Sequence, residues 1–411
     1  MKFSEDVDNL IPSSSSGTSS LSGMTRQYDV VVVGGGPAGS TCGRLCAEQG
    51  LSVCLVEEHG AAGIPVQCAG LLSMNAFREC EVSQSSILAT VRGAKVVSSL
   101  GPVLEFDARM PKAHVVDRAV LDREMLARAA GAGAEVRMKT SFADRKGQRI
   151  VTRGVNGKEE ILFRILVAAD GARSRVARVM GMRRPEVFLA GLQADILHGM
   201  DGSRVEIHPD AAPDFFGWAI PIGAGRARVG LAGRTGVRER FRSFLSLISQ
   251  DSHQAQVHLV SGTIPLGTMA RTFGDRVLFV GDAAGMAKPT SGGGVYTGVR
   301  AARHAARVAG EAVALEDFDD GMLSRYERAW KEDFGRELEQ GMQVFRLRQQ
   351  ISPGDMAKIV SALSDPAIVE DIVELGDMDR PGRLARRLLT RPSLYPLLGI
   401  LIRSGVRLIY E

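Results

Sequence analysis

The clearest pattern of apolar and polar positions in this chain lies between residues 28 and 57. An apolar, β-branched run at 30–33 ends in three glycines, a helical pattern starts at Pro37, and a second apolar run ends at Glu57. This order predicts a strand, a tight turn, a helix and a second strand. Such a unit cradles the pyrophosphate of a dinucleotide between the turn and the start of the helix.

Each small residue of the turn has a physical role in that prediction. Gly34 permits the tight turn out of the strand, Gly36 lets the backbone approach a pyrophosphate, and Gly39 lets the helix pack closely on the strand. Pro37, which Ala38 follows, suits the first helical turn because its missing N–H group costs nothing there. The free N–H groups of that turn and the helix dipole favour a phosphate.

An acidic pair closes the second strand. Glu57 stands at the usual spacing for a hydrogen bond to a ribose 2′-hydroxyl, and Glu58 follows it. The unit therefore predicts dinucleotide binding, with a glycine-rich turn of some other α/β protein as the alternative interpretation. It does not distinguish FAD from NAD.

The rest of the chain alternates between strand and helix patterns. Residues 63–73 are rich in Gly and Pro and predict a loop. Residues 91–109 predict strands of a separate antiparallel layer, and residues 187–233 predict antiparallel strands of a sheet with one covered face. The other predicted elements are strands at 134–138, 161–169 and 276–284, helices at 119–130, 238–249 and 295–311, and a helical region from 323 onward.

Two further strand ends carry motifs that suit a long cofactor. One strand ends in Asp170-Gly171 and another in Gly281-Asp282, whose carboxylate suits ribityl hydroxyls. Gly292, Gly293 and Gly294 then open a helix whose free N–H groups would face the N1/O2 edge of a flavin, where a reduced ring is negatively charged. FAD must be held along its whole length, whereas NAD needs little beyond the first unit. The three motifs together therefore predict FAD.

These motifs resemble those of the FAD-dependent geranylgeranyl reductases, digeranylgeranylglycerophospholipid reductases among them, within the larger aromatic-hydroxylase-like group of flavoproteins. The resemblance covers about residues 28–311. It implies that the Asp170-Gly171 and Gly281-Asp282 motifs bind the cofactor, and that Arg118, which opens the helix after the first β layer, touches it.

Residues 65–73 match the reductases more narrowly. They resemble the cysteine-containing loop that lies beside the flavin in that family. The resemblance implies cofactor contacts at Cys68, Ala69 and Gly70 and a catalytic role for Cys68.

The segment Phe216-Gly217-Trp218-Ala219-Ile220-Pro221 resembles the aromatic-x-Trp-x-Phe-Pro motif of the same reductases. The resemblance implies that Phe216, Trp218 and Pro221 line a prenyl cavity, and it makes Trp218 a second catalytic candidate. Ile220 departs from the reductase pattern, because flavin halogenases have Ile at that place. The halogenase pattern is also incomplete, since its first aromatic residue is Trp and here is Phe216.

Plain structural roles are the alternatives for these residues. Cys68 would then be a small buried apolar side chain and Trp218 ordinary core packing. Asp170 and Asp282 would be solvated turn acids, and Arg118 a surface residue of a first helical turn.

The overall composition limits the class of protein further. With 411 residues, 24% of them charged, and a formal net charge of +4, the chain predicts a soluble protein of two or three structural units and no nucleic-acid partner. Its five cysteines all lie before residue 81, without a CxxC pair or a His/Cys ligand cluster. No metal site is therefore predicted, and reduced thiols in a cytoplasmic protein are expected.

The two ends of the sequence differ in character. Acidic residues at 5–8 stand where a signal peptide would carry positive charge, and the serine-rich tract at 13–22 predicts disorder. No apolar run is long enough to span a bilayer. A basic amphipathic C-terminus suits peripheral contact with the cytoplasmic membrane face, and a helix pair packed on the body is the alternative. Its arginines are Arg380, Arg383, Arg386, Arg387, Arg391, Arg403 and Arg407.

We therefore expect an α/β protein (α+β overall) with an FAD-binding Rossmann-like domain, an antiparallel β-sheet substrate domain and a helical C-terminal region. The expected boundaries are a disordered N-terminus at 1–26, a discontinuous FAD-binding domain at 27–88, 112–182 and 268–320, a substrate domain at 89–111 and 183–267, and the helical region at 321–411.

The resemblance implies reduction of carbon–carbon double bonds in a geranylgeranyl chain by hydride transfer from reduced FAD. The expected partners are a prenyl lipid substrate and, as electron donor, NADPH or a ferredoxin-like carrier. A flavin monooxygenase or halogenase of an aromatic substrate and an electron-transfer flavoprotein are the competing hypotheses.

Overall fold

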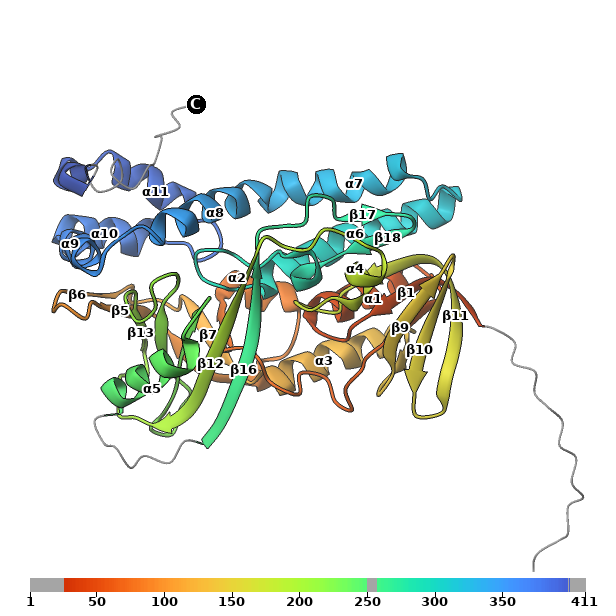
Figure 1. Ribbon diagram of the computed structural model, residues 1–411, viewed down its shortest axis with the longest axis horizontal. Coiled ribbons are helices and arrows are strands. Elements are labelled where there is room, and N and C mark those ends of the chain that lie inside the picture. The colour runs from red at the N-terminus through yellow and green to blue at the C-terminus, as the bar shows by residue number, and fades with distance from the viewer. Residues whose placement is uncertain (1–25, 250–256, 398, 400–411) are drawn as a thin grey trace, which may run out of the picture.

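The computed structural model describes residues 26–249, 257–397 and 399. Over these residues the chain forms three β-sheets, with a layer of C-terminal helices across them (Figure 1). The predicted class, with a Rossmann-like parallel sheet, a second largely antiparallel sheet and a helical C-terminal region, is confirmed. The serine-rich tract at 13–22 and two of the C-terminal arginines, Arg403 and Arg407, lie outside the described residues.

The first sheet contains the predicted strand–turn–helix–strand unit. Its parallel strands lie in the order β18 (Val277–Phe279), β11 (Gly157–Ala168), β1 (Gln27–Val33), β2 (Val53–Val56) and β8 (Glu135–Arg137). Antiparallel pairing adds β17 (Phe273–Gly274), β10 (Arg149–Gly154) and β9 (Ser141–Lys146). Because β1, β11 and β18 are parallel neighbours, the three predicted cofactor motifs start from one edge of the sheet.

Helices cover this sheet. α1 (Pro37–Glu48) packs against both α3 (Arg118–Gly131) and α6 (Val295–Leu315). Val30, Val31 and Val32 of β1 are 0% exposed, as expected for a parallel strand with both faces covered. α3 begins after Asp117, whose carboxylate accepts hydrogen bonds from two backbone N–H groups of the first turn. The two shorter helices of this part are α4 (Arg175–Val179), after β11, and η2 (Gly281–Ala284), after β18.

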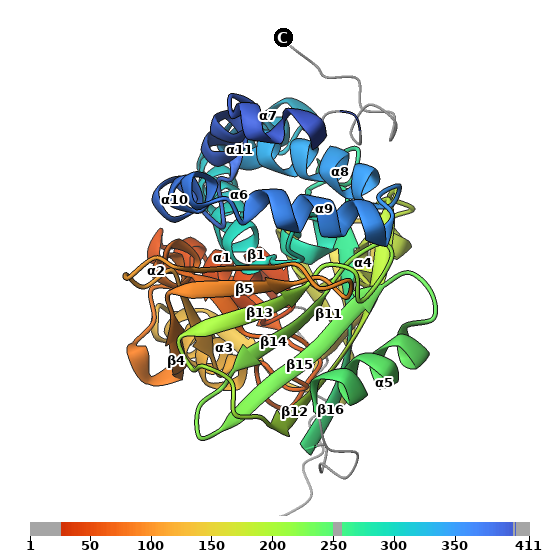
Figure 2. The same ribbon diagram turned by 90° about the vertical axis from the view of Figure 1, so that its left-hand side faces the viewer.

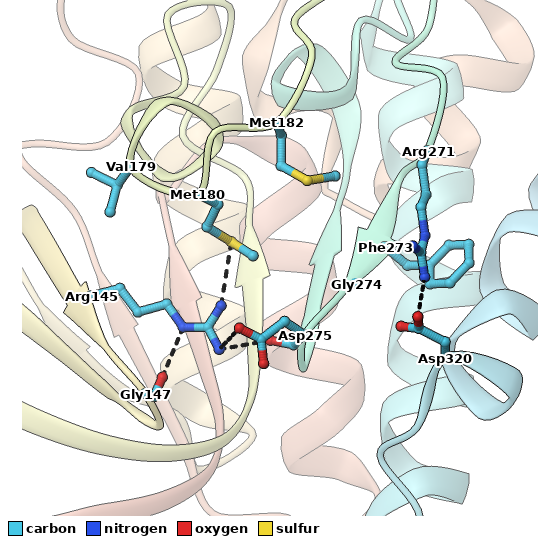
Figure 3. Close-up of a pocket in the computed structure, with 10 residues that line it drawn as sticks. All are labelled: Arg145, Gly147, Val179, Met180, Met182, Arg271, Phe273, Gly274, Asp275 and Asp320. Carbon is cyan, nitrogen blue, oxygen red and sulfur yellow. Dashed lines mark hydrogen bonds and ion pairs between the residues drawn. The ribbon is translucent and has the colours of Figure 1, made fainter.

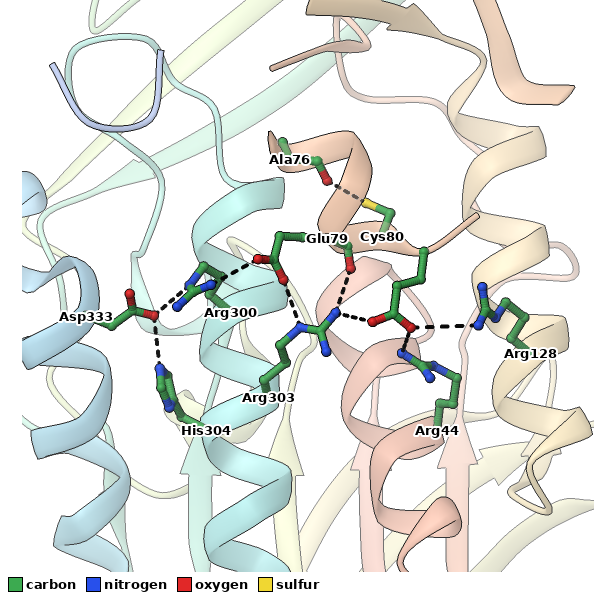
Figure 4. A network of polar contacts seen from close by, with 10 residues as sticks. Arg44, Ala76, Glu79, Cys80, Arg128, Arg300, Arg303, His304 and Asp333 are labelled. Carbon is green, nitrogen blue, oxygen red and sulfur yellow. Dashed lines mark hydrogen bonds and ion pairs between the residues drawn. The ribbon is translucent and has the colours of Figure 1, made fainter. Parts of the chain in front are cut away.

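A network of ion pairs ties α6 to α1 and to α2 (Met74–Cys80), as Figure 4 shows. Glu79 binds Arg300 and Arg303 of α6, with an N–O distance of 2.9 Å to each. Glu81 binds Arg44 of α1 at 2.7 Å and also contacts Arg303. Single exposed ion pairs contribute little, but a connected network of partly buried pairs holds its elements together. It fixes the helix whose first turn follows Gly294.

The second sheet has seven strands (Figure 2). Their order is β16 (Val257–Leu266), β12 (Val187–Leu197), β15 (Arg226–Gly233), β14 (Gly217–Pro221), β13 (Arg204–His208), β5 (Gly93–Val97) and β6 (Val103–Asp107). All neighbours are antiparallel except β13 and β5, which are parallel. Residues 91–109 form the predicted antiparallel strands, β5 and β6, which continue this sheet and lie apart from the first, parallel one.

Both faces of the second sheet are covered, whereas the alternation at 187–233 predicted one covered face. Ala219 of β14 lies in the apolar cluster under α5 (Val237–Ile248). Its neighbours Trp218 and Ile220 point the other way, into a cluster that includes Phe345 from the C-terminal helices. All five residues of β14 are buried as a result.

A small third sheet links the other two. Its strands lie in the order β3 (Leu71–Ser73), β7 (Ala113–Val116) and β4 (Ile87–Val91). Along the chain, α2 follows β3 directly and η1 (Gln84–Ser86) directly precedes β4. Residues 71–73 were predicted as loop. They form a strand because β7 offers them a partner that is about 40 residues away along the chain, which local composition does not reveal.

The C-terminal helices begin with α7 (Asp320–Trp330), a π-helical turn η3 (Lys331–Gly335) and α8 (Arg336–Arg348), which follow one another directly. The Tyr326 hydroxyl donates to the Phe279 carbonyl at 2.5 Å, and Trp330 Nε1 donates to Thr272 Oγ1 at 2.9 Å, so α7 is fixed to the first sheet. The remaining elements are α9 (Pro353–Leu363), α10 (Pro366–Leu375), α11 (Gly382–Leu389) and η4 (Pro392–Leu394). Among the described residues, no helix combines the length and the apolar character needed to cross a membrane.

Candidate active site

The glycine turn after β1 has the geometry that a phosphate loop requires. Gly34 has φ +105°, and a Cβ there would lie 2.3 Å from the Ala169 carbonyl oxygen. A Cβ at Gly39 would lie 1.9 Å from the Gly34 carbonyl oxygen. Both positions therefore exclude any side chain, so that the loop, α1 and the end of β11 can approach one another.

Gly36 differs from these two glycines because it faces open space. Apart from its own chain neighbours, no atom of the part of the chain that the structure describes lies within 4 Å of the position that a Cβ would take, and its φ of −71° would suit any residue. Gly36 is the N-cap of α1, Pro37 opens the helix, and no side chain in the described ranges caps its first N–H groups. An open cradle at an uncapped helix N-terminus fits the pyrophosphate of FAD.

Glu57, rather than Glu58, is built into this loop. The buried Glu57 carboxylate accepts hydrogen bonds from the Gly35 N–H at 2.7 Å and from the His59 N–H at 2.8 Å. Its Oε1 also lies 2.7 Å from His59 Nδ1. The side chain of Glu58 is 67% exposed and lies 3.9 Å from His59 Nε2. Glu57 thus holds the loop from the end of β2, where a ribose would lie.

The three predicted cofactor motifs come together in space. Besides its approach to Ala169, a Cβ at Gly34 would lie 3.1 Å from Cα of Asp170. A Cβ at Gly281 would lie 3.2 Å from Cβ of Ala38, so η2 and the first turn of α1 are in contact. The Asp282 carboxylate lies 2.7 Å from the Cβ position of Gly294. The structure therefore joins the ends of β1, β11 and β18 with the start of α6.

Asp282 and Arg118 form the charged part of this region. Burial raises the pKa of Asp282 from 3.8 to about 6, and the Arg118 guanidinium opposes that shift. Arg118 donates to both carboxylate oxygens of Asp122, at 2.8 and 2.7 Å. Burial lowers the pKa of Arg118, but Asp122 and Cys68 outweigh it and the pKa rises. Arg118 is thus a mostly buried cation between Asp282 and the cysteine loop, not a surface residue.

Asp170 makes its contacts inside its own turn. One carboxylate oxygen accepts a hydrogen bond from Ser174 Oγ at 2.7 Å, and the other accepts from the N–H groups of Arg175 and Val176 at 2.7 and 3.0 Å. Burial raises its pKa. Asp170 therefore fastens α4 to the end of β11, and the backbone of Asp170 and Gly171, where φ is +71°, lies next to the phosphate loop.

The cysteine loop is held by polar contacts on both sides. Gln193 Nε2 donates to the Cys68 carbonyl at 3.1 Å, and Arg228 Nη1 donates to the Ala69 carbonyl at 3.0 Å. Gly70 has φ +79°, and a Cβ there would lie 2.5 Å from the Val116 carbonyl oxygen, so it must be glycine. The half-buried Cys68 is fixed between the second and third sheets, and its Sγ accepts a hydrogen bond from the Gly70 N–H at 3.4 Å. The other four cysteines of the chain are buried free thiols.

The aromatic motif lines an apolar layer beside this loop. Trp218 is 8% exposed, and its indole Nε1 has no hydrogen-bond partner among the described residues. Phe216 meets the Trp218 ring edge-on at 6.1 Å, and Pro221 at the end of β14 is buried. A Cβ at Gly292 would lie 3.4 Å from the ring of Phe215, so the glycine turn before α6 contacts this layer.

Three residues that hold this region, Gln193, Asp195 and Arg228, carried no signal in the sequence. Arg228 donates from Nε and Nη2 to the Asp195 carboxylate at 2.8 and 3.2 Å, in addition to its bond to Ala69. Gln193 and Asp195 are polar residues within a strand pattern, and Arg228 fits the same alternation on β15. Their role depends on the pairing of β12 with β15, which places them beside a loop more than 120 residues away.

A pocket of ≈ 470 Å³ is lined by residues that include none of the predicted site residues (Figure 3). It lies at the β17–β18 turn, and two ion pairs, Arg145 with Asp275 at 3.0 Å and Arg271 with Asp320 at 2.5 Å, cross its wall. A second pocket of ≈ 340 Å³ backs the segment before the glycine turn and is lined by Ala287, Pro289 and Met342 among others. Among the described residues, no cluster of His, Cys, Asp and Glu could hold a metal ion.

Comparison with known proteins decides the family. Residues 27–198 match the family model of the FAD binding domain, which confirms the predicted cofactor, and residues 251–363 match that of the lycopene cyclase protein. Digeranylgeranylglycerophospholipid reductase 2 of Methanothermobacter thermautotrophicus is 32% identical over 359 residues, which cover 82% of this chain and 92% of that protein. The chain belongs to the geranylgeranyl reductase family. The predicted resemblance is therefore confirmed.

Solved structures agree on the fold of this geranylgeranyl reductase family member. A geranylgeranyl bacteriochlorophyll reductase-like protein from Thermoplasma acidophilum has a TM-score of 0.78 at 24% identity and covers 89% of this chain and 99% of its own. The p-nitrophenol 4-monooxygenase of Pseudomonas putida has a TM-score of 0.69 at 17% identity and covers 85% and 98%. The fold is thus shared by proteins whose names give different reactions, a reduction and a monooxygenation, and the fold alone does not select between them.

Proposed function

We propose that this protein is an FAD-dependent reductase that saturates carbon–carbon double bonds in the geranylgeranyl chains of a lipid or other prenyl-linked substrate. The observation that carries the proposal is the meeting of the Cys68 loop, the glycine turn before α6 and β14 at one apolar layer. Relatives that are 30–32% identical and are named digeranylgeranylglycerophospholipid reductase support it. The candidate substrates are archaeal-type digeranylgeranyl glycerophospholipids, chlorophyll-type prenyl chains and prenyl quinones.

In this proposal the cofactor is held along its length by residues of the first sheet and its helices. The turn from Gly34 to Gly39 binds the pyrophosphate, and Glu57 accepts a hydrogen bond from a ribose hydroxyl. Asp282 faces the ribityl chain and Arg118 lies near it. Gly292, Gly293 and Gly294 present the N-terminus of α6 to the pyrimidine edge of the ring.

The chain's contribution to catalysis is positioning in a dry site. When bound, reduced FAD would supply a hydride to one carbon of the double bond, and a nearby donor would supply a proton to the other. An unactivated alkene offers no charge for the enzyme to stabilise, so exclusion of water and close placement must lower the barrier. Phe216, Trp218 and Pro221 line the prenyl cavity, and Cys68 lies against the reacting part of the substrate. NADPH or a ferredoxin-like carrier delivers the electrons.

A lipid substrate also suggests where the protein works. α11 has no buried residue, and Arg383 and Arg386 on it are exposed. Arg387 and Arg391 point to the body, where they bind Asp371 at 3.1 and 2.6 Å. We propose peripheral contact between the exposed basic side of α11 and the cytoplasmic membrane face.

The proposal is tested by mass spectrometry of the substrate. The FAD-loaded protein is reduced with dithionite without oxygen and incubated with digeranylgeranyl glycerophospholipid, geranylgeranyl diphosphate or a prenyl quinone. We expect products heavier by two hydrogens for each bond reduced, formed only when protein, FAD and reductant are all present. A panel with no gain for any prenyl substrate would refute the proposal.

A second candidate function is a monooxygenase or halogenase acting on an aromatic substrate. Fold similarity to p-nitrophenol 4-monooxygenase and Ile220 in the aromatic motif favour it. Oxygen-dependent hydroxylation or halogenation of an aromatic compound, without prenyl reduction, would establish this alternative. Oxidation by a carrier protein with no small-molecule product would instead indicate an electron-transfer flavoprotein.

A further inference from the structure

Lys288 closes the glycine turn that precedes α6. Its carbonyl accepts hydrogen bonds from the N–H groups of Gly292 at 2.7 Å and Ser291 at 3.2 Å, and its own N–H donates to the Gly293 carbonyl at 3.0 Å. The backbone of Lys288 therefore fixes the shape of the turn. In the sequence it is an isolated basic residue before Pro289, and no motif drew attention to it.

The side chain of Lys288 makes a buried ion pair with the C-terminal helical region. Its ammonium donates to Asp379 Oδ1 at 2.7 Å and to the Met378 carbonyl at 2.8 Å. The side chain of Lys288 is 11% exposed and that of Asp379 is 0% exposed. The pair is thus shielded from water. Charges interact more strongly in such a buried place than in water, and removing either partner leaves the other charge buried and unpaired.

Asp379 also reaches the cysteine loop. Its second carboxylate oxygen accepts a hydrogen bond from the hydroxyl of Ser73, the last residue of β3, at 2.5 Å. Asp377 Oδ1 accepts from the N–H groups of Asp379 at 2.7 Å and Arg380 at 3.0 Å, which shapes the connection between α10 and α11. One carboxylate therefore joins the glycine turn, the strand after the Cys68 loop and the C-terminal helices.

The charge of Lys288 lies at the face of the turn. Its Cε is 3.4 Å and its Nζ 3.9 Å from the position that a Cβ would take at Gly293. The proposed function puts the pyrimidine edge of the flavin ring against Gly292–Gly294. A reduced flavin is negative at that edge, so a cation nearby stabilises the reduced form, and an anion nearby destabilises it.

We propose that Lys288 and Asp379 are positioning residues that set the reduction potential of the bound FAD, with Lys288 favouring the reduced form and Asp379 limiting that effect. The inference rests on the proposed function only for the place of the ring. It assigns a role to the C-terminal helical region, which through Asp379 supplies the counter-charge for the turn.

The test is the FAD midpoint potential of Lys288→Met and Asp379→Asn, measured by anaerobic dye equilibration without any substrate. Methionine removes the charge at similar length, and asparagine keeps an acceptor for Ser73. We expect the potential to fall in Lys288→Met and to rise in Asp379→Asn, each by about a tenfold change in the ratio of reduced to oxidised flavin, ~30 mV for two electrons. Lys288→Arg should keep a potential close to that of the wild type.

Opposite signs separate electrostatics from a general loss of structure. Shifts in the same direction, or no shift in variants that retain FAD, would overturn the proposal. If either single variant fails to hold FAD, the double variant Lys288→Met/Asp379→Asn decides, because it leaves no unpaired buried charge at this pair. A midpoint potential near that of the wild type would support the proposal. A shifted midpoint potential would refute it. The matched control is Lys331→Met, which breaks an ion pair with Glu327 of the same 2.7 Å length on the helical region and should shift nothing.

The measurement is independent of the reductase reaction. Opposite shifts without any prenyl reduction would sink the proposed function and leave the role of the pair intact. Prenyl reduction by the wild type, with unshifted potentials in the variants, would support the proposed function and refute the role of the pair.

Discussion

The two ends of the candidate cofactor site are built in different ways. The pyrophosphate end comes from one continuous stretch, residues 30–57, in which β1, α1 and β2 contact one another. The ring end is assembled from stretches far apart in the sequence, namely the cysteine loop, β14, the glycine turn and the connection that holds Asp379.

This difference separates local from long-range requirements. At the pyrophosphate end, Gly39 and Glu57 contact Gly34 and Gly35 of the same stretch, and the end of the neighbouring strand β11 adds Ala169 beside Gly34. At the ring end, Arg228 holds a carbonyl 159 residues away and Asp379 holds a hydroxyl 306 residues away. The second end therefore depends on the assembly of the whole molecule.

The largest expected effect comes from Gly34→Val. A side chain at φ +105° and 2.3 Å from the Ala169 carbonyl adds strain and a clash, and should cost about 3 kcal/mol or more of unfolding free energy. FAD should be absent from the purified protein. Thermal unfolding and the flavin absorbance after gel filtration measure the two effects.

The control for that variant is Gly36→Ala, because its side chain would meet open space. Its melting temperature should equal that of the wild type, while FAD should bind about tenfold more weakly, a loss of about 1.4 kcal/mol. A Gly34→Val protein with wild-type stability and flavin content would show that the stretch is more adaptable than its geometry implies.

A pH effect of intermediate size is expected from Asp282. Because burial raises its pKa from 3.8 to about 6, ionising it costs the folded protein free energy. The free energy of unfolding of the FAD-free protein should be greatest below pH about 4 and fall as the pH rises through 6, by up to about 3 kcal/mol, since the folded state then loses a proton that it held more tightly than the unfolded state. Asp282→Asn should lack this part of the pH dependence.

The measurement is the difference in melting temperature between wild type and Asp282→Asn from pH 4 to 8, both without FAD. Other titrating groups cancel in that difference. A difference that stays constant over the range would show that Asp282 titrates near its ordinary value and that the strand end is more hydrated than its surroundings suggest.

The features that could be predicted from the sequence also divide into local and long-range ones. The β1–α1–β2 unit could be predicted because each of its signals, from the valine run to Glu57, lies within 30 residues. The parallel pairing of β13 with β5 could not, because alternation reports which face is buried and not the direction of the neighbouring strand. The ion pair of Lys288 and Asp379 could not be predicted either, because a single charged residue in a turn looks the same in the sequence whether it faces water or a buried partner.

Arg228→Met tests the long-range end more directly. The variant loses two hydrogen bonds to Asp195 and one to the Ala69 carbonyl, and leaves a half-buried carboxylate without its cation. We expect a loss of about 2 kcal/mol of unfolding free energy, with FAD still bound because the pyrophosphate end is untouched. Calorimetry and flavin absorbance measure both. Loss of FAD at wild-type stability would mean that the two ends are not separable.

A smaller effect is expected from Trp218→Phe. Since Trp218 Nε1 has no partner among the described residues, the substitution removes no hydrogen bond, and the smaller ring should cost about 1 kcal/mol. If the indole lines the substrate cavity, the KM for a prenyl substrate should rise several-fold while FAD content stays constant. An unchanged KM together with a lower melting temperature would reduce Trp218 to core packing.

The smallest effect on the fold, and the clearest separation of fold from chemistry, is expected from Cys68→Ala. Its thiol is half-buried and accepts one long bond from the Gly70 N–H, while the loop is held through the Cys68 and Ala69 carbonyls, which alanine retains. Stability should change by less than about 1 kcal/mol and FAD content should not change. Prenyl reduction in the dithionite assay should nevertheless fall at least about tenfold, because the side chain rather than the loop would then contact the substrate. Full reductase activity in Cys68→Ala would show that the Cys68 side chain takes no part in the chemistry and that the loop only lines the site. The ring end would then act only by positioning the substrate and excluding water.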